Sequence, residues 1–316
     1  MAFRKKILVL GAMGSIGKEI FLNLKNRKYK VNGLTHKKNL DPAIIKTNYL
    51  NMNNRAKNLL FDADIIINCI GENTHQTKME FKNIKILSKI IKYINRKKKI
   101  TFIHFSTCGV YGNLTVNVIS ETNIPNPSTY YAKTKYAGEE LLKKNLKKNI
   151  SLFILRPSQV IGKKMPNTSL KKLGYFIKKK LFIYFDNKKC VYSYIFFDDL
   201  FIFILGLFKK KTTYYEIFNI SNYSTYENIV NIHLKIYGIK INFFSINRKV
   251  SYFLFNLIIY IFNFFKLIFK NDFQINKNTY SSLTSNTIFN SNKIQKYLNI
   301  STLKKINFTN LKDLYE

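Results

Sequence analysis

The residues with the clearest capacity for chemistry are Tyr131 and Lys135, a phenol and an ammonium four positions apart. On a helix this spacing places both side chains on one face, because residues i and i+4 are neighbours there. A free phenol has a pKa of about 10 and is a poor acid or base near neutral pH. A nearby cation favours the phenolate and would bring the pKa closer to the working range. The spacing therefore predicts a general acid/base at Tyr131 that Lys135 activates.

Small hydroxyl side chains precede this pair in the sequence. The apolar run Thr101 to Phe105 is expected to be a strand, and it ends in Ser106 and Thr107. In parallel α/β sheets, ligands bind at the carboxyl ends of the strands. We therefore expect Thr107 to lie at the same site as Tyr131, although a strand-end cap is the simpler alternative.

A glycine-rich turn stands near the start of the chain, in the segment Gly11-Ala12-Met13-Gly14-Ser15-Ile16-Gly17. The turn lies between an expected strand and an expected helix. Without Cβ atoms the chain can turn sharply and let a pyrophosphate approach the backbone N–H groups at the helix N-terminus. We predict that a nicotinamide dinucleotide binds at Gly11, Gly14, Ser15, Ile16 and Gly17. The alternative is a glycine turn of another α/β protein.

The end of the second expected strand indicates which dinucleotide is bound. A protein selecting NAD is expected to have a carboxylate there, which accepts hydrogen bonds from the ribose hydroxyls. This chain has Thr35-His36-Lys37-Lys38 instead. His36 and Lys37, with Lys38, could meet a 2′-phosphate. NADP is therefore favoured over NAD, unless these lysines merely face solvent.

Two further positions are assigned to the cofactor. Asp64 precedes the expected strand at Ile65 to Ile70, where it could contact the adenine edge or cap the strand. Gly71 follows that strand and would let the cofactor approach the backbone closely.

The elements that must position these groups follow a βαβ pattern. Short apolar runs at Ile7 to Leu10, Lys30 to Leu34, Ile65 to Ile70, Thr101 to Phe105 and Leu152 to Leu155 alternate with helical apolar spacing. This predicts an α/β protein with a Rossmann-like doubly wound parallel sheet. We expect an NAD(P)-binding domain at residues 1–165 and a smaller substrate-binding region at 166–316, with a soft boundary and some later segments returning to the sheet.

Six motifs in this order resemble the extended short-chain dehydrogenase/reductases, in particular the nucleotide-sugar epimerase/dehydratase family. They are the G-x-x-G-x-x-G turn, Ser106-Thr107-x-x-Val110-Tyr111-Gly112, Glu121-Thr122 before Pro127, Tyr131-x-x-x-Lys135, Leu155-Arg156-Pro157-Ser158 and Phe197-Asp198-Asp199. Six ordered motifs are far more specific than any one of them.

The resemblance implies roles for individual residues. Tyr131 would be the acid/base for a sugar hydroxyl, and Lys135 its activator and a ligand of the nicotinamide ribose. Thr107 would hydrogen-bond the reacting oxygen. Asn83 matches a family asparagine, although it could equally be solvated, and Pro157 and Ser158 are implied as further cofactor contacts.

Departures from the family pattern narrow the chemistry. Dehydratases of the family carry an Asp-Glu pair directly after the threonine, where this chain has Cys108 and Gly109. Dehydration is therefore disfavoured, and epimerisation or keto reduction remains. Gln159 stands where asparagine is usual and Tyr192 where arginine is usual, two positions used for the substrate diphosphate. The segments Met165 to Leu170 and Leu283-Thr284 resemble relatives in surface-polysaccharide synthesis.

Two other functions are compatible with the same fold. One is a non-catalytic NADP-binding scaffold subunit, which would not need Thr107, Tyr131 or Lys135. The other is a dehydrogenase of a hydrophobic, sterol-like alcohol. The intact residues favour an enzyme acting on a nucleotide-linked sugar or a related small molecule.

Charge and composition limit the range of partners. The 316 residues carry a formal charge of +36, which attracts anions over the whole molecule. The lysines are spread along the chain, without a zinc-finger, helix-turn-helix or aromatic RNA-binding signature, so we expect no nucleic-acid partner. Three widely spaced cysteines predict neither a disulfide framework nor a metal site.

The last expectations concern location. The N-terminus leads directly into a strand with no signal peptide, which predicts a cytoplasmic protein. From Tyr252 to Phe269 the chain is almost continuously apolar and flanked by lysines. A packed helix is the first interpretation, and peripheral contact with a membrane is the second. A homodimer is left open.

Overall fold

The computed structural model of the chain describes residues 5–94, 98–112, 114, 116–146, 149–212, 214–246, 252–254, 256–257, 280–281 and 283–315. Its centre is a seven-stranded sheet in which every strand pair is parallel. In spatial order the strands are β11 (Tyr215–Ile220), β7 (Ile150–Pro157), β5 (Ile100–Phe105), β4 (Ile65–Asn68), β1 (Ile7–Leu10), β2 (Val31–Thr35) and β3 (Ile44–Lys46). The strand order reverses between β1 and β4, which is where ligands bind in such sheets. The predicted doubly wound sheet is confirmed.

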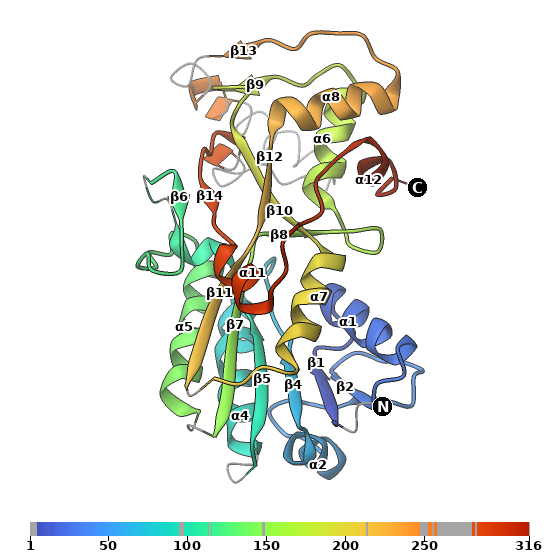
Figure 1. Cartoon of the computed structure of the whole chain (residues 1–316), viewed down its shortest axis with the longest axis vertical. Helices are drawn as coiled ribbons and strands as arrows, with labels where there is room; N and C mark the ends of the chain where they lie inside the picture. The colour runs from blue at the N-terminus through green and yellow to red at the C-terminus, as the bar shows by residue number, and fades with distance from the viewer. Residues whose placement is uncertain are drawn as a thin grey trace.

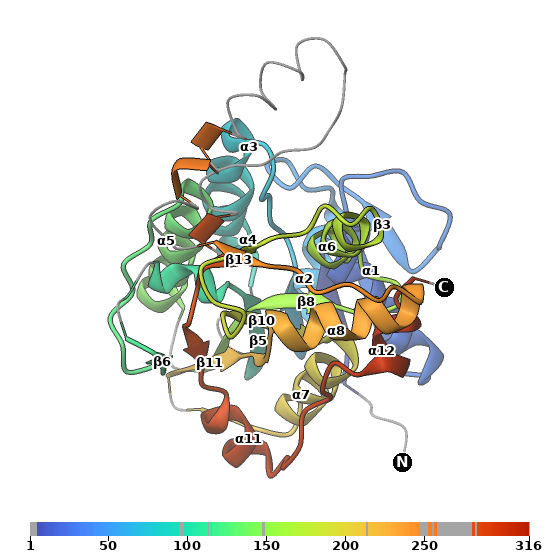
Figure 2. The same cartoon turned by 90° about the horizontal axis from the view of Figure 1, so that it is seen from above.

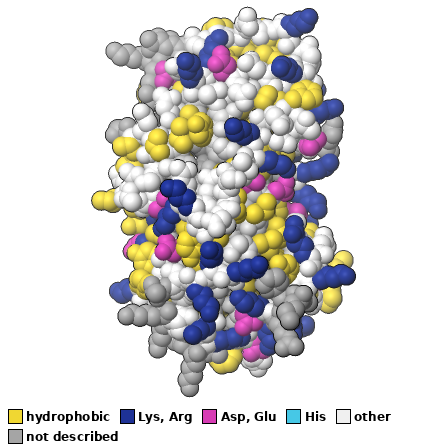
Figure 3. All heavy atoms as spheres, viewed as in Figure 1, with side chains coloured by type: hydrophobic (Ala, Val, Ile, Leu, Met, Phe, Trp, Pro, Cys, Tyr) yellow, Lys and Arg dark blue, Asp and Glu magenta, His cyan; other side chains and the backbone are white. Residues whose placement is uncertain are grey.

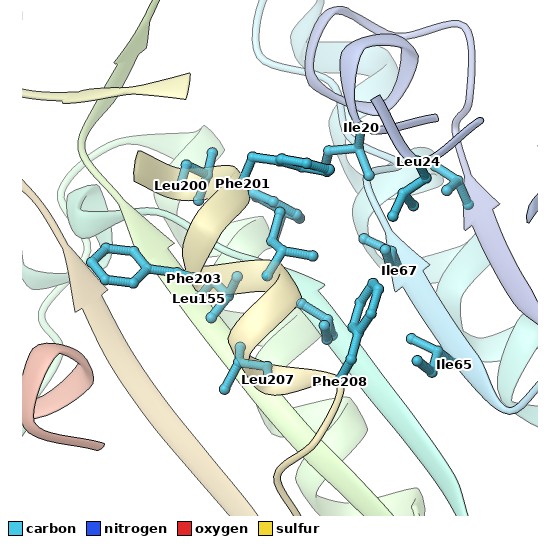
Figure 4. Packing of buried hydrophobic residues seen from close by; sticks show 14 of the residues in the cluster. Ile20, Leu24, Ile65, Ile67, Leu155, Leu200, Phe201, Phe203, Leu207 and Phe208 are labelled. Atoms are coloured by element: carbon cyan, nitrogen blue, oxygen red, sulfur yellow. The ribbon is translucent and has the colours of Figure 1, made fainter. Parts of the chain in front are cut away.

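Helices cover both faces of this sheet (Figure 1). One face carries α1 (Ser15–Asn26) and α7 (Phe197–Leu207), and the other carries α2 (Asn54–Asp62), α4 (Ile86–Tyr93) and α5 (Tyr130–Asn145). Successive strand residues point to opposite faces. Ile65 and Ile67 therefore pack against Ile20, Leu24 and Phe208 from the α1 and α7 side (Figure 4). Ile66 packs on the other face. Because both faces are buried, the central strands β1, β4 and β5 are largely apolar, which made them easy to find in the sequence.

A smaller unit lies over the carboxyl edge of the sheet, as the view from above shows (Figure 2). It contains the three-stranded sheet β12 (Asn222–Thr225), β10 (Val191–Phe196) and β8 (Gln159–Ile161). Helices α6 (Thr168–Lys178), α8 (Tyr226–Tyr237) and α12 (Phe308–Lys312) pack on it through an aromatic-rich core. Two short pairs complete the strands, β9 (Tyr184–Phe185) with β13 (Ser245–Ile246) and β6 (Val118–Ile119) with β14 (Ile288–Phe289).

The two units are not consecutive pieces of chain. After β8 and β10 the chain returns to the large sheet, where α7 covers one face and β11 pairs with β7 along six residues. Helix α11 (Asn292–Leu298) also contacts β11. The domain boundary near residue 165 stays a prediction.

Most of the apolar stretch at 252–269 lies outside the described residues, which include only 252–254 and 256–257 of it. Within the described part of the chain, no helix is long and apolar enough to cross a membrane.

Candidate active site

The glycine turn after β1 packs tightly against the loop that follows β4. Gly11 has a φ of +73°, and a Cβ at this position would lie 3.1 Å from the carbonyl carbon and oxygen of Cys69. A Cβ at Gly17 would lie 2.3 Å from the Gly11 oxygen. Only glycine fits at these positions, because the backbone approaches itself so closely.

The amino end of α1 is open toward the carboxyl edge of the sheet. Its N-cap, Gly14, has no side chain to bond the first-turn amides, and the first turn contains no acidic residue. The N–H groups of Ser15, Ile16 and Gly17 are therefore available at the positive end of the helix dipole. This geometry fits a pyrophosphate, so the turn meets the first requirement of a dinucleotide site.

Cations gather at the end of β2, as the sequence suggested. The Lys37 ammonium lies 3.4 Å from the carbonyl oxygen of Met13, inside the glycine turn. His36 is next to it, and burial, Lys82 and Lys37 together lower the pKa of its imidazole. Lys82 comes from the π-helical turn η1 (Phe81–Lys85) and is ion-paired to Glu72 at 2.7 Å. Sequence reasoning missed Lys82, because the fold alone brings it to His36.

Asn83 fixes the loop after β4 to helix α5. Its Nδ2 donates to the Thr134 hydroxyl at 2.9 Å, and its Oδ1 accepts from the Glu72 N–H at 3.2 Å. Only 3% of the residue is exposed. The alternative of a solvated asparagine is therefore wrong. Gly71 lies in the same loop, where a Cβ would be 3.5 Å from the Asn83 Oδ1.

Helix α5 presents both members of the Tyr–Lys pair. Thr129 caps its amino end by accepting a hydrogen bond from the Ala132 N–H at 3.2 Å, and the helix runs without a break to Asn145. Lys135 is 3% exposed, and a Cβ at Gly71 would lie 4.0 Å from its ammonium. Burial lowers the pKa of Lys135 to about 8. Among the described residues its ammonium has no hydrogen bond or ion pair, which leaves it free to hold a ligand.

The expected tuning of the phenol is not seen in this arrangement. Burial raises the pKa of Tyr131 to about 12, and no contribution from Lys135 opposes it. Burial raises the pKa of Cys69, which the charge of Lys135 opposes, and burial together with that charge lowers the pKa of His104. The lowering of the phenol pKa by Lys135 therefore stays a prediction. With its pKa raised by burial, the Tyr131 phenol carries its proton near neutral pH.

Thr107 lies beside the start of α5. Its hydroxyl oxygen accepts a hydrogen bond from the Gly109 N–H at 3.1 Å and caps the turn η2 (Cys108–Tyr111). A Cβ at Gly109 would lie 3.4 Å from that oxygen and 3.8 Å from the Cβ of Ala132, the residue after Tyr131. Thr107 is thus a cap of η2 that lies near the start of α5.

A buried polar network behind the site was not foreseen. Arg156 on β7 donates to both carboxylate oxygens of Glu139 on α5, at 3.0 and 2.6 Å, and to the Tyr111 hydroxyl at 2.8 Å. Ser106 also donates to Glu139, and Tyr111 donates to Asn219 on β11. The network joins the motifs at residues 106–112, 131–139 and 155–158. The available signal was Glu139 itself, an acidic residue one turn beyond Lys135 on the buried face of the helix.

The remaining predicted contacts lie at the end of β7. Pro157 is its last residue, and Ser158 follows, donating its N–H to the Ile220 oxygen at 3.0 Å. The Ser158 hydroxyl is buried and has no partner among the described residues. A buried hydroxyl without a partner costs free energy, so a ligand atom that bonded it would be favoured.

The structure does not bring Asp64 to this site. Asp64 precedes β4, and its carboxylate accepts from the Lys6 N–H at 2.7 Å and pairs with Lys98 at 2.8 Å. Because β1 and β4 are parallel, Asp64 lies at the amino edge, opposite the glycine turn. Its assignment to the adenine is therefore wrong, and the alternative of a strand cap agrees with its position. The other predicted residues lie at the carboxyl edge: Gly11, Gly14, Ser15, Ile16, Gly17, His36, Lys37, Gly71, Asn83, Thr107, Tyr131, Lys135, Pro157 and Ser158.

The positions that depart from the family pattern form neutral contacts. The Cys108 thiol is buried and donates to the Arg156 oxygen at 2.9 Å, and burial raises its pKa. Gln159 donates to the Ser169 hydroxyl, which in turn bonds the Tyr192 hydroxyl at 3.0 Å. Gln159 and Tyr192 thus belong to one uncharged chain across β8, α6 and β10. Among the described residues, no group of histidine, cysteine or carboxylate side chains could hold a metal ion.

Two curated proteins resemble the chain in sequence. It is 31% identical to the "Putative UDP-glucose 4-epimerase" of Methanocaldococcus jannaschii over 194 residues, which cover 55% of this chain and 63% of that protein, less than two thirds of its length. It is 26% identical to the GDP-6-deoxy-D-talose 4-dehydrogenase of Aggregatibacter actinomycetemcomitans over 213 residues, 65% of this chain and 70% of that protein.

Solved structures share the whole fold. A UDP-glucuronic acid 4-epimerase from Bacillus cereus, in complex with NAD, superposes with a TM-score of 0.69 at 21% identity, covering 98% of this chain and 96% of its own. RMD from Pseudomonas aeruginosa, complexed with NADPH, superposes with a TM-score of 0.67 at 14% identity, covering 100% and 98%. The model of the NAD dependent epimerase/dehydratase family matches residues 7–221. The chain therefore belongs to the NAD dependent epimerase/dehydratase family, as the six ordered motifs predicted.

Proposed function

We propose that the chain is an NAD(P)-dependent epimerase or keto reductase of a nucleotide-linked sugar, working in the synthesis of a surface polysaccharide. The observation that carries this proposal is Lys135. Its ammonium is buried at the carboxyl edge, next to Gly71, with no partner among the described residues. Burying an unpaired charge is costly, so a protein keeps one where a ligand needs it. A non-catalytic scaffold would not need this lysine.

The chain's own groups divide into binding and proton transfer. The amides of Ser15, Ile16 and Gly17 would hold the pyrophosphate. Lys135 would bond the nicotinamide ribose, and Ser158 would bond a nearby atom of the cofactor. Asn83 would keep the loop at Gly71 in place. A bound nicotinamide supplies or accepts the hydride. Tyr131 would move the proton of the sugar oxygen, and Thr107 would hydrogen-bond that oxygen and orient it.

In the site without ligand, the protonation state of Tyr131 favours reduction of a carbonyl over oxidation of a hydroxyl. With a pKa of about 12 the phenol carries its proton at neutral pH. It can therefore donate that proton to a carbonyl oxygen while the carbonyl carbon receives the hydride. Epimerisation needs the reverse step as well, in which Tyr131 takes the proton from a hydroxyl. A ligand that brought positive charge beside the phenol would favour that step.

Water elimination is not supported by this site. The residues after Thr107 are a buried thiol that bonds to a backbone oxygen and a glycine, and neither can act as an acid or base there. The names of both curated relatives describe reactions at position 4 of a nucleotide-linked sugar. Nucleotide sugars with a 4-hydroxyl or 4-keto group are therefore the first substrates to test.

For the cofactor, we propose NADP at least as readily as NAD. The support comes from Lys37, whose ammonium lies at the glycine turn, and from Lys82 near His36. No carboxylate ends β2.

The test is a panel of nucleotide sugars and lipidic ketones, incubated with the purified protein while the nicotinamide absorbance is followed. Epimerisation leaves no net change in absorbance, so product separation by chromatography accompanies each assay. Conversion of a 4-hydroxyl or 4-keto nucleotide sugar supports the proposal. Conversion of only lipidic ketones, or cofactor binding without any turnover across the panel, would count against it.

A further inference from the structure

The lysines on the face of the molecule shown in Figure 3 are spread over its whole height. Their charge attracts an anionic dinucleotide without choosing one place for it. We expect that place to be set by the backbone amides of the glycine turn, at the start of α1. A side chain that fixes the position of this turn would therefore affect cofactor binding.

The hydroxyl of Tyr49 contacts the first residue of the glycine turn. Tyr49 lies in the connection between β3 and α2, and only 3% of the residue is exposed. Its hydroxyl donates to the Leu34 oxygen, near the end of β2, at 2.7 Å. The same hydroxyl accepts from the Gly11 N–H at 3.1 Å. These two bonds tie the end of β2 to the start of the turn.

Packing alone does not require a hydroxyl at this position. Tyr49 belongs to the same apolar cluster as Leu10, Leu34 and Ile70, and phenylalanine would supply the same ring. A buried hydroxyl costs free energy unless it is hydrogen-bonded. Burial raises the pKa of the Tyr49 phenol, so the hydroxyl keeps its proton and can donate it to the Leu34 oxygen. The hydroxyl is thus a specific link to the backbone.

The bonded peptide groups lead directly to the start of α1. Besides the Tyr49 hydroxyl, the Leu34 oxygen accepts from the N–H groups of Gly11 and Ala12, both at 3.0 Å. The Gly11 oxygen accepts from the Gly14 N–H at 2.8 Å, and Gly14 is the N-cap of α1. A displacement of Leu34 or Gly11 would therefore displace the first-turn amides of α1 as well.

We propose that Tyr49 is a positioning residue of the dinucleotide site, whose hydroxyl holds the glycine turn where the amides of α1 can meet the pyrophosphate. It acts through the backbone of Gly11 and Leu34 and not by touching the cofactor. This inference rests on the cofactor site of the proposed function. Because the pyrophosphate is common to NAD and NADP, Tyr49 supports the binding of both equally.

The test is calorimetric titration of the full chain and its Tyr49→Phe variant with NADP and with NAD. The variant keeps the ring and loses only the hydroxyl. Both cofactors are expected to bind roughly two- to tenfold more weakly, which is the effect of losing one hydrogen bond, and the ratio of their affinities should not change. Once a substrate is known, the KM for the cofactor should rise while kcat at saturating cofactor stays parental.

The matched control is Tyr194→Phe. It also removes a buried tyrosine hydroxyl, which accepts from the Ile306 N–H at 2.9 Å in the smaller unit. This variant should lose a comparable amount of thermal stability and bind both dinucleotides as the parent does. Titrations are run at a temperature at which thermal unfolding curves show the parent and both variants to be folded.

Four results would overturn the inference. Parental affinity in Tyr49→Phe would show that the hydroxyl does not position the turn, and an equal loss in Tyr194→Phe would show a general effect of lowered stability. A loss for NADP alone would assign the hydroxyl to the 2′-phosphate end of the site. A Tyr49→Phe chain that folds at no temperature would assign it to the fold. A parent that binds neither dinucleotide would instead contradict the proposed cofactor site, and this inference with it.

Discussion

Arg156 on β7 and Glu139 on α5 form two hydrogen bonds to each other, at 3.0 and 2.6 Å, in the buried interface between sheet and helix. Glu139 lies one turn after Lys135 and two turns after Tyr131, so this pair anchors the helix that carries the proposed catalytic groups. We expect its role to be positional, since both side chains are buried and bonded to each other.

Removing Glu139 should destabilise the protein more than removing a neighbouring surface carboxylate. Glu139→Ala leaves the Arg156 guanidinium buried without its counter-charge, which typically costs about 3–5 kcal/mol. Glu140→Ala is the matched control, because Glu140 is exposed and, among the described residues, its one ion pair is with Lys143 of the same helix. Urea unfolding curves of both variants measure the difference. Equal midpoints would show that the buried pair contributes no more than the surface pair.

Tyr131→Phe should lower kcat by at least about 10²-fold while leaving dinucleotide affinity nearly unchanged, because the ring stays and only the proton carrier is lost. Tyr130→Phe is the control, since Tyr130 is exposed on the same helical turn. A substrate from the nucleotide-sugar panel is needed first. A Tyr131→Phe enzyme that turns over at the parental rate would exclude the phenol as acid/base.

Dinucleotide affinity should fall as the pH rises through about 8. Burial lowers the pKa of Lys135 from 10.5 to about 8, so the ammonium that would hold the ribose loses its proton above that pH. The expected loss is up to about tenfold per pH unit, measured by fluorescence titration. Lys135→Met should bind weakly at every pH in this range. If the affinity of Lys135→Met fell with pH as steeply as that of the parent, the titrating group would not be Lys135.

The same lysine predicts the opposite trend for stability in the absence of ligand. Between pH 8 and 10.5 the unfolded chain keeps a proton at Lys135 that the folded protein has released. This group therefore makes the free energy of unfolding rise as the pH rises. The difference in unfolding free energy between the parent and Lys135→Met isolates this contribution. No pH dependence of that difference would contradict the lowered pKa.

Gly14→Val should abolish dinucleotide binding. A Cβ at this position would lie 3.2 Å from the Gly11 oxygen, and a branched side chain would cover the amides at the start of α1. Gly238→Ala serves as the control, because it also replaces a glycine, at a φ of +64°, but in the smaller unit and with no atom within 4 Å of the new Cβ. Isothermal titration with NADP distinguishes the two. Parental affinity in Gly14→Val would remove the basis for the cofactor site.

Lys37→Ala should weaken NADP more than NAD, because its ammonium lies at the glycine turn and would face a 2′-phosphate there. A charge-assisted bond of this kind contributes about 1.5–3 kcal/mol, which is roughly tenfold or more in affinity. Lys38→Ala is the control, since Lys38 is exposed and, unlike Lys37, has no hydrogen bond to the turn in the described part of the chain. Equal losses for both cofactors would mean that Lys37 does not select between them.

The sequence alone predicted the large sheet because its strands are buried on both faces. Continuous apolar runs such as Ile65 to Ile67 have few other interpretations. The smaller unit was harder to predict, since β8 and β9 are short and partly exposed and their pairing partners lie far away in the chain. Local patterns do not encode such long-range pairing.

In the candidate site, too, local sequence signals were found and long-range contacts were not. Glycines and the Tyr–Lys spacing are local signals, and the structure gathers them at one edge. Asp64 was assigned to the wrong edge of the sheet. A polar residue can precede or follow a strand, and only one that follows the strand lies at the carboxyl edge. Lys82 and the bonds of Arg156 to Glu139 and Tyr111 were missed for a different reason: the partners are distant in sequence, and the fold alone brings them together.

Strand β11 has a consequence for how this protein can be made and divided. Until residues 215–220 have been synthesised, β7 has no neighbour on one side, although all eight of its residues are buried in the finished fold. An apolar edge of this kind pairs readily with other chains and promotes aggregation. A fragment that stops at residue 165 would keep that edge open permanently. The dinucleotide fold should therefore be expressed only as part of a chain that extends beyond Ile220.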